Sequence, residues 1–212
     1  MNIPNSITCQ IANLNELYNK YFPEKTDGIF VDVGAYDGYN WSNVWGLAEI
    51  GWHGICLEPI RTFAKQCEER YVGKPITVFN LCAGDFVGET VLYMDPGGVS
   101  NTIDEETAKR NPFGFSYDPI PVPITVVTLT SLFDQIQLPE DFELISIDVE
   151  GAELKVLNGW DIDKYRPKMV IIETHKGQSG KDYNAPEIYR ILESHGYSEI
   201  QCDTLNSIFI RQ

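Results

Sequence analysis

The stretch IFVDVGAYDGYN, residues 29–40, decides how this chain folds. Residues 29–35 form an apolar run rich in β-branched residues, which is typical of a strand buried on both faces of a parallel sheet. The strand carries Asp32, and Gly34 and Gly38 then flank a tight turn that leads into a helix. Glycine permits unusual backbone angles and lets a ligand approach the main chain closely. The stretch therefore predicts a strand, a ligand-binding turn and a helix in succession.

The rest of the chain continues this alternation. Apolar runs predict sheet strands at 54–59, 76–84, 143–151 and 168–175, with an extra strand at 87–95. Helical spacing predicts helices at 11–21, 41–50, 60–71, 152–159 and 185–195, and a short strand that runs into a helix at 125–136. The final YSEIQCD and SIFIRQ predict an antiparallel hairpin. The pattern as a whole indicates an α/β fold, with a mostly parallel sheet covered by helices on both faces.

The length of 212 residues fits a single domain over 1–212, with a helical lead-in at 1–27. Residues 96–123 are rich in proline and glycine, and they predict a long irregular loop. A loop of that length inside a compact domain is more often functional than inert. We therefore interpret it as a mobile lid over the strand ends.

Composition narrows the possible partners. A net charge of −15 repels phosphate backbones, and no cluster of basic residues offsets it, so we expect no nucleic-acid partner. Neither a signal peptide nor an apolar run of about 20 residues is visible, which favours a cytoplasmic protein without a membrane span. The cysteines are scattered without metal spacing, and Cys56, Cys67 and Cys82 lie among apolar neighbours, so we interpret them as buried thiols.

A second signal is Glu58, at the end of the strand that follows the glycine turn. In open α/β sheets, ligands bind beyond the carboxyl ends of the strands, and a carboxylate there can accept hydrogen bonds from both ribose hydroxyls of an adenosine cofactor. The alternative is a solvated glutamate at a strand end. The turn has the spacing Gly-x-x-x-Gly, and the missing middle glycine disfavours a dinucleotide.

A third signal is a group of acids on the same rim. Asp148 and Glu150 close one apolar strand, and Glu173 and His175 close the next. Titratable groups that converge on a crevice suit proton transfer or cation binding. The alternative is structural, since such acids can cap neighbouring helices and His175 can be a packed rim residue.

A series of short motifs follows in order along the chain: DVGAYDG (32–38), SN (42–43), GWHGICLEP (51–59), CAGD (82–85), VSN (99–101), SIDVEGAELKVLNG (146–159) and PKMVIIETH (167–175). Taken together, these motifs resemble the FkbM family of methyltransferases. The resemblance covers about residues 29–175, and its most specific part is the DVEG-x-E…VL-x-G block.

The resemblance implies the class I methyltransferase fold, with a mostly parallel seven-stranded sheet and a closing antiparallel hairpin. It also implies S-adenosylmethionine as the cofactor and methylation of a hydroxyl, often on a sugar. Glu58 would hold the ribose, and Ser100 matches a serine of the family's mobile segment. Ile60 departs from the family, because many members have asparagine after Glu-Pro. The other implied cofactor-binding residues are Asp32, Gly34, Ala35, Asp37, Gly38, Ser42, Pro59, Ala83, Gly84, Asp85 and Asp148.

The sequence therefore predicts a methyltransferase whose acceptor is a small molecule, with a sugar hydroxyl as the expected group. Asp148, Glu150, Glu173 and His175 are the candidate bases, and a divalent cation is an open possibility without assigned ligands. Two alternatives stay open. One is a nicotinamide-dependent oxidoreductase, and the other is a non-catalytic module that binds an adenosine cofactor.

Overall fold

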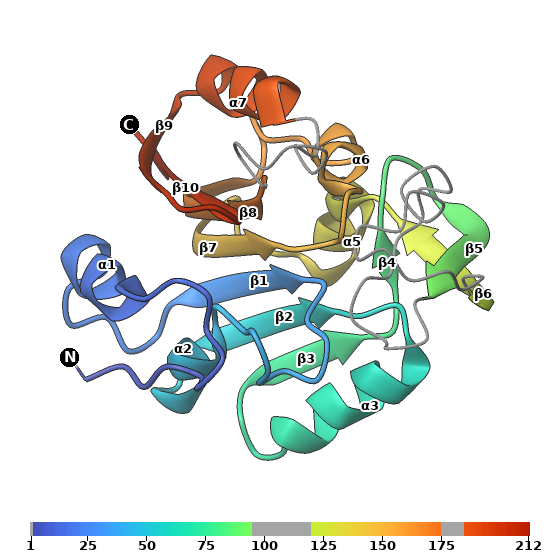
Figure 1. Cartoon of the computed structure of the whole chain (residues 1–212), viewed down its shortest axis with the longest axis horizontal. Helices are drawn as coiled ribbons and strands as arrows, with labels where there is room; N and C mark the ends of the chain where they lie inside the picture. The colour runs from blue at the N-terminus through green and yellow to red at the C-terminus, as the bar shows by residue number, and fades with distance from the viewer. Residues whose placement is uncertain (1, 95–119, 175–184) are drawn as a thin grey trace.

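The computed structural model describes residues 2–94, 120–174 and 185–212. Its main element is a seven-stranded sheet of order β3-β2-β1-β7-β8-β10-β9 (Figure 1). In this sheet β3, β2, β1, β7 and β8 are parallel to one another, whereas β10 runs antiparallel to both of its neighbours, β8 and β9. Their bounds are β1 (Ile29–Val33), β2 (His53–Leu57), β3 (Ile76–Phe79), β7 (Asp141–Ile147), β8 (Arg166–Glu173), β9 (Tyr197–Cys202) and β10 (Asn206–Arg211). The expected parallel sheet with a closing hairpin is confirmed.

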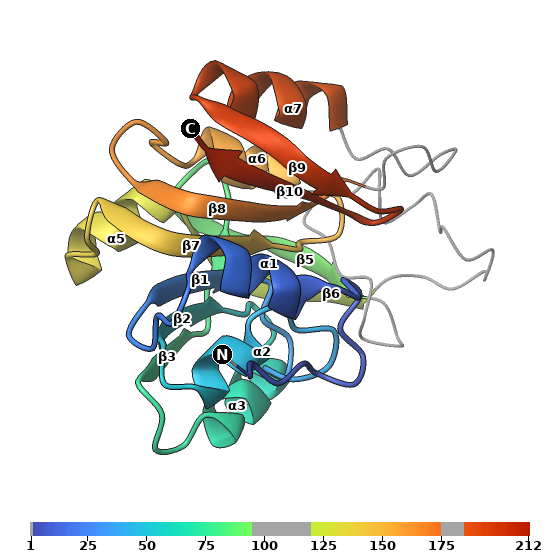
Figure 2. The ribbon, with the colours of Figure 1, turned by 90° about the vertical axis from the view of Figure 1, so that its left-hand side faces the viewer.

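Helices cover both faces of this sheet, because its strands are apolar on both sides. In β1, Val31 and Val33 face the core under α5, α6 and α7, while Phe30 faces the core under α1, α2 and α3. Figure 2 shows α7 beside the β9–β10 hairpin. The helices are α1 (Leu14–Tyr21), α2 (Trp45–Glu49), α3 (Arg61–Arg70), α5 (Leu129–Ile136), α6 (Glu153–Asn158) and α7 (Ala185–Ser194).

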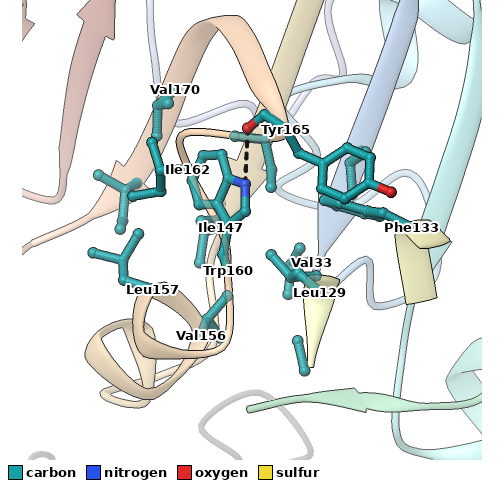
Figure 3. Close-up of a cluster of buried hydrophobic side chains, with 14 of the residues drawn as sticks. Val33, Leu129, Phe133, Ile147, Val156, Leu157, Trp160, Ile162, Tyr165 and Val170 are labelled. Carbon is teal, nitrogen blue, oxygen red and sulfur yellow. Dashed lines mark hydrogen bonds between the residues drawn. The ribbon is translucent and has the colours of Figure 1, made fainter. Parts of the chain in front are cut away.

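The core under α5 and α6 is built around Trp160, which follows α6 (Figure 3). Its indole N–H donates a hydrogen bond to the carbonyl of Tyr165 at 3.0 Å, so the polar edge of a 5% exposed ring is satisfied. The ring of Tyr165 in turn packs edge-on against Phe133, with ring centroids 5.1 Å apart. This cluster fixes α6, and with it the turn that joins α6 to β7.

The expected strand at 76–84 is divided between two sheets, which corrects the sequence analysis. β3 ends at Phe79, and the chain then turns at Asn80, whose side-chain amide donates to the carbonyls of Glu58 and Pro59 at 2.9 and 2.8 Å. The chain continues into a small sheet of order β4-β6-β5, which lies beside the carboxyl ends of β1, β2 and β3 (Figure 1). Its strands are β4 (Cys82–Ala83), β5 (Gly88–Met94) and β6 (Ile120–Val127).

The expected lid at 96–123 is also too long, because residues 120–123 belong to β6. Pro121 and Pro123 pair with Tyr93 and Val91 of β5. On the other edge of β6, β4 pairs with Val126 and Val127, at the end of the strand away from the two prolines. Proline is tolerated in a strand whose other edge needs no N–H donor. The remaining part of the expected lid, up to residue 119, lies outside the described residues.

Strand ends differ from the expected ranges where the backbone turns left-handed. The strand expected at 143–151 ends at Ile147, since Glu150 and Gly151 have φ values of 52° and 95°. Asp148 and Glu150 therefore lie in a turn after β7 rather than in the strand. The strand expected at 29–35 likewise ends at Val33, before the left-handed Gly34.

Two expectations about composition can be compared with the described residues. Cys56, Cys67 and Cys82 are buried free thiols, as the sequence indicated. In the described ranges, none of the helices combines the length and the apolarity that crossing a membrane requires.

The end of α6 gives a stability prediction. A Cβ at Gly159 would lie 1.9 Å from the carbonyl oxygen of Gly84, which is backbone and cannot swing away. Gly159→Ala should lower the free energy of unfolding by about 1–3 kcal/mol, as overpacking does. Urea denaturation measures the change. Gly88→Ala is the matched control, because its Cβ would meet only the Phe86 ring at an ordinary 3.5 Å. Equal stability of the two variants would contradict the prediction.

Candidate active site

Parallel strands gather the acids predicted from sequence at one edge of the sheet. Asp32 lies in β1 beside Ser146 of β7, and Glu58 follows β2 directly. Asp148 follows β7 directly, and Glu173 is the last residue of β8. Carboxyl ends of neighbouring parallel strands meet at the same edge, where ligands bind in this class of sheet. The structure therefore brings together four of the predicted site residues.

The turn after β1 lies against the turn after β7. Gly34 has a φ of 89°, and a Cβ there would sit 1.8 Å from the carbonyl oxygen of Asp148. The N–H groups of Gly34 and Ala35 both donate to the carbonyl of Leu57 at 3.0 Å. Glycine is required at position 34 for its conformation and for its lack of a side chain.

Glu58 is held by the main chain at the end of β2. Oε1 accepts the N–H of Ile60 at 2.8 Å, and Oε2 accepts the N–H of Tyr36 at 3.0 Å. The carboxylate is 5% exposed, and this burial raises its pKa to about 7 against the lowering effect of the two hydrogen bonds. Each oxygen retains acceptor capacity, so the carboxylate can accept from two adjacent hydroxyls of a ribose.

Asp37 and Ser42, predicted cofactor residues, bind the main chain of their own loop. Asp37 Oδ1 accepts the N–H groups of Tyr39 and Asn40 at 2.9 and 2.8 Å. Ser42 Oγ accepts the N–H of Trp45 at 3.0 Å, at the start of α2. Both side chains therefore order the loop after the glycine turn, and their contact with a cofactor stays a prediction.

The segment predicted to border an adenine, Ala83 to Asp85, leads out of the second sheet. Ala83 is 2% exposed and packs in the core, while the Gly84 N–H donates to the carbonyl of Val127 at 2.9 Å. Asn80 lies nearer to Glu58, because its amide donates to the carbonyls of Glu58 and Pro59. Sequence reasoning missed Asn80, although a polar residue inside an apolar run was a usable signal.

Asp32 is buried on the sheet face that α1 to α3 cover. It is 6% exposed, and burial raises its pKa to about 7, with further contributions from the charges of Asp148 and Glu58. Its hydrogen bond with Ser146 acts in the opposite direction, and Asn43 Nδ2 donates to Ser146 Oγ at 3.3 Å. The buried Asp32 thus faces a polar layer under the site rather than open solvent.

The acids of the β7 and β8 ends form a tight group, which we call the rim cluster: Asp148, Glu150 and Glu173. One carboxylate oxygen from each lies within 4.8 Å of the others. Burial raises the pKa of Asp148 to about 6, and burial together with the neighbouring acids raises the pKa of Glu173 well above its usual value. Asp148 and Glu173 also share a hydrogen bond, which lowers the pKa of Asp148 and raises that of Glu173.

Another acid beside the rim cluster was not singled out from the sequence. Glu153, the first residue of α6, is fully buried, and its Oε1 accepts the N–H groups of Val149 and Gly151 at 3.1 and 3.2 Å. Its position in the DVEG-x-E block was the available signal. His175 and Ser100 lie outside the described residues.

Two solved structures with a similar fold are methyltransferases. The METTL16 MTase domain is 11% identical, with a TM-score of 0.53, 99% of this chain covered and 71% of that one. The O-methyltransferase TomG from Streptomyces achromogenes, in complex with SAM, is 11% identical, with a TM-score of 0.52, 94% of this chain covered and 78% of that one. No curated protein sequence matches the chain. The fold is that of the class I methyltransferases.

The family follows from a match along the sequence. Residues 32–199 match the family model of the methyltransferase FkbM domain. This range starts at the end of β1 and includes every acid of the strand-end site. The chain therefore belongs to the FkbM family of S-adenosylmethionine-dependent methyltransferases, and the resemblance stated from its motifs is confirmed.

The burial of Asp32 predicts how stability depends on pH. Its folded pKa of about 7 exceeds the ordinary 3.8, so the folded state binds more protons between these values and loses stability as the pH rises. Asp32→Asn removes this loss. The difference in unfolding free energy, variant minus wild type, should therefore be larger at about pH 8 than at about pH 4 by more than about 1 kcal/mol. Urea unfolding at both pH values measures it, and a constant difference would contradict the raised pKa.

Proposed function

We propose that this methyltransferase transfers the methyl group of S-adenosylmethionine to a hydroxyl of a sugar or another small molecule. The observation that carries the proposal is the rim cluster, a group of converging carboxylates beside the glycine turn, of which Asp148 and Glu173 have raised pKa values. Methyl transfer is a displacement at carbon, so alignment of donor and acceptor supplies much of the rate. A hydroxyl acceptor also has to lose its proton, which the rim cluster can accept.

On the cofactor side, the Glu58 carboxylate would bind the ribose hydroxyls. The glycine turn would lie along the methionine part, and the segment from Ala83 to Asp85 would border the adenine. The bound cofactor supplies an activated methyl group. The remaining residues proposed to contact it are Asp32, Gly34, Ala35, Asp37, Gly38, Ser42, Pro59 and Asp148.

On the acceptor side, the hydrogen-bonded pair of Asp148 and Glu173 would act as the base. In its ionised form the pair would accept the proton of the acceptor hydroxyl. The acceptor oxygen would then be free to take the methyl group that the cofactor supplies, with S-adenosylhomocysteine as the product that leaves. The raised pKa of Asp148, about 6, lies closer to neutral pH, where a general base is most effective.

A divalent cation is the second way in which the rim cluster could act. Carboxylate oxygens are the ligands that Mg²⁺ and Mn²⁺ prefer, and the cluster places one from each of its members within 4.8 Å. A cation there would lower the pKa of a bound hydroxyl and orient it. Chelation separates this possibility from direct base catalysis.

Two other functions were open at the sequence level. Membership of the methyltransferase family and the class I fold argue against a nicotinamide-dependent oxidoreductase. A non-catalytic module that binds an adenosine cofactor would have no use for converging acids on the acceptor side. Titration with S-adenosylhomocysteine and with NADH tests the first alternative. Turnover of labelled donor with a panel of sugars and glycolipid precursors tests the second.

The role of Glu58 predicts a loss of cofactor affinity. Glu58→Ala removes the acceptor of one or two charge-assisted hydrogen bonds and should weaken S-adenosylmethionine binding by about 10- to 100-fold with the fold intact. Calorimetry measures the affinity. Glu193→Ala, an exposed position on α7, is the control and should bind as wild type does. Wild-type affinity in Glu58→Ala would remove the ribose assignment.

The role of the rim cluster predicts a loss of turnover instead. Asp148→Asn and Glu173→Gln keep the shape of each side chain and remove its charge. Each should lower kcat by about 10²- to 10⁴-fold, as loss of a general base does, and should change cofactor affinity by less than about tenfold. Steady-state kinetics and calorimetry measure the two effects. Near-normal turnover in both variants would mean that the acids are structural and that alignment alone carries the reaction.

A chelator distinguishes the two modes of the rim cluster. Loss of activity that magnesium or manganese restores would favour a bound cation. Activity that a chelator leaves unchanged would favour direct proton transfer to the carboxylates.

A further inference from the structure

We propose that Glu153 is a positioning residue, whose buried carboxylate holds the turn at 148–151 so that Asp148 and Glu150 face Glu173. The inference deepens the proposed function and rests on it, because the rim cluster is the group that Glu153 would position. Glu153 itself makes no contact that the proposed reaction requires. Its contacts are with the main chain of the turn.

The hydrogen bonds of Glu153 enclose Glu150. Oε1 accepts the N–H of Val149 at 3.1 Å on one side of Glu150, and that of Gly151 at 3.2 Å on the other. One carboxylate oxygen therefore fixes the peptide group between Asp148 and Val149 and the one between Glu150 and Gly151, so the turn that bears the Glu150 side chain is held at both ends. The exposed fraction of Glu153 is 0%, so water does not compete for these bonds.

The turn needs such support because its conformation is unfavourable. Glu150 has a φ of 52° and Gly151 a φ of 95°, and a left-handed backbone costs energy at a residue with a side chain. The start of the turn is tied to β1, since the Asp148 N–H donates to the Val33 carbonyl at 2.9 Å. The main-chain bond that closes the turn, from Ala152 N to Val149 O, is long at 3.4 Å. The two hydrogen bonds to Glu153, at 3.1 and 3.2 Å, are shorter than this bond and hold the middle of the turn.

The electrostatic consequences connect this support to the chemistry. Burial and the charge of Asp148 raise the pKa of Glu153 to about 8, and Glu153 in turn helps to raise the pKa of Glu173. A buried carboxyl among other carboxyls is costly, so an apolar residue would serve general stability better. A geometric demand from the turn accounts for its presence, because an apolar side chain could not bind the two N–H groups.

Variants of Glu153 can separate its hydrogen bonds to the turn from its ability to ionise. Glu153→Gln keeps an oxygen acceptor for both N–H groups and cannot ionise, whereas Glu153→Ala removes the acceptor. Glu143 gives a matched control, because Oε2 of this acid accepts the Ile29 N–H at 2.7 Å, at the other end of β1 from the site. Glu143→Ala thus removes a carboxylate-to-backbone bond that has no connection with the rim cluster.

With the full chain and an acceptor that is turned over, Glu153→Ala should lower kcat by at least about tenfold, because a misplacement of about 1 Å can cost about 10²-fold. The affinity for S-adenosylhomocysteine should change by less than about tenfold, the limit expected for Asp148→Asn, because the effect of Glu153 on the cofactor passes through that residue of the turn. Glu153→Gln should recover most of kcat. Glu143→Ala should lose stability and keep its kcat. If Glu153→Ala does not fold, Glu153→Asp, which keeps the carboxyl group and shortens the reach, takes its place.

Amide hydrogen exchange gives a readout that does not depend on the acceptor. The N–H groups of Val149 and Gly151 should lose protection in Glu153→Ala and keep it in Glu153→Gln. Unchanged protection in Glu153→Ala, or a kcat equal to that of Glu143→Ala, would overturn the proposal, as would a Glu153→Gln variant as slow as Glu153→Ala. Absence of turnover in the wild type would count against the proposed function, whereas amide protection would still decide whether Glu153 holds the turn.

Discussion

The site depends on the close approach of two backbone turns. Gly34 after β1 and Asp148 after β7 come so near that a Cβ on Gly34 would lie 1.8 Å from the Asp148 carbonyl oxygen. The parallel pairing of β1 with β7, continued by the hydrogen bond from Asp148 N to Val33 O, brings the turns to this distance. The proposed cofactor side and acceptor side thereby become adjacent. A side chain at position 34 would force them apart, and donor and acceptor would lose their alignment.

A second consequence of this packing is a high density of buried acid. The pKa values of Asp32, Glu58, Asp148 and Glu153 are all raised, and burial is the largest cause in each case. Main-chain N–H groups offset part of the cost at Glu58 and Glu153, each of which accepts two of them. Strained or costly arrangements persist where the surrounding structure over-determines them, and they cluster at functional sites. The burial of these acids therefore supports the proposal that this edge of the sheet carries out chemistry.

The same physical element, a main-chain N–H that binds a carboxylate, shapes both sides of the site. On the cofactor side, the Tyr36 N–H binds Glu58, so the glycine turn is tied to the carboxylate that is proposed to bind the ribose. On the acceptor side, Glu153 binds the turn that bears Asp148 and Glu150. The geometry is thus set by short-range bonds within and between the loops, and the core around Trp160 packs against α6, which follows the turn after β7 (Figure 3).

The sequence by itself determined the sheet strands, the glycine turn, the acids at the strand ends and the family, because these follow from hydrophobic periodicity and from local motifs. Only the tertiary structure decided that the run at 76–84 divides at Asn80 between two sheets, since the side chain of Asn80 bonds to carbonyls beyond another strand. It also decided the role of Glu153, whose partners lie close in sequence but are reached only through the left-handed turn at Glu150 and Gly151. Periodicity reports which residues are buried, whereas hydrogen bonds between loops depend on where the packed strands end.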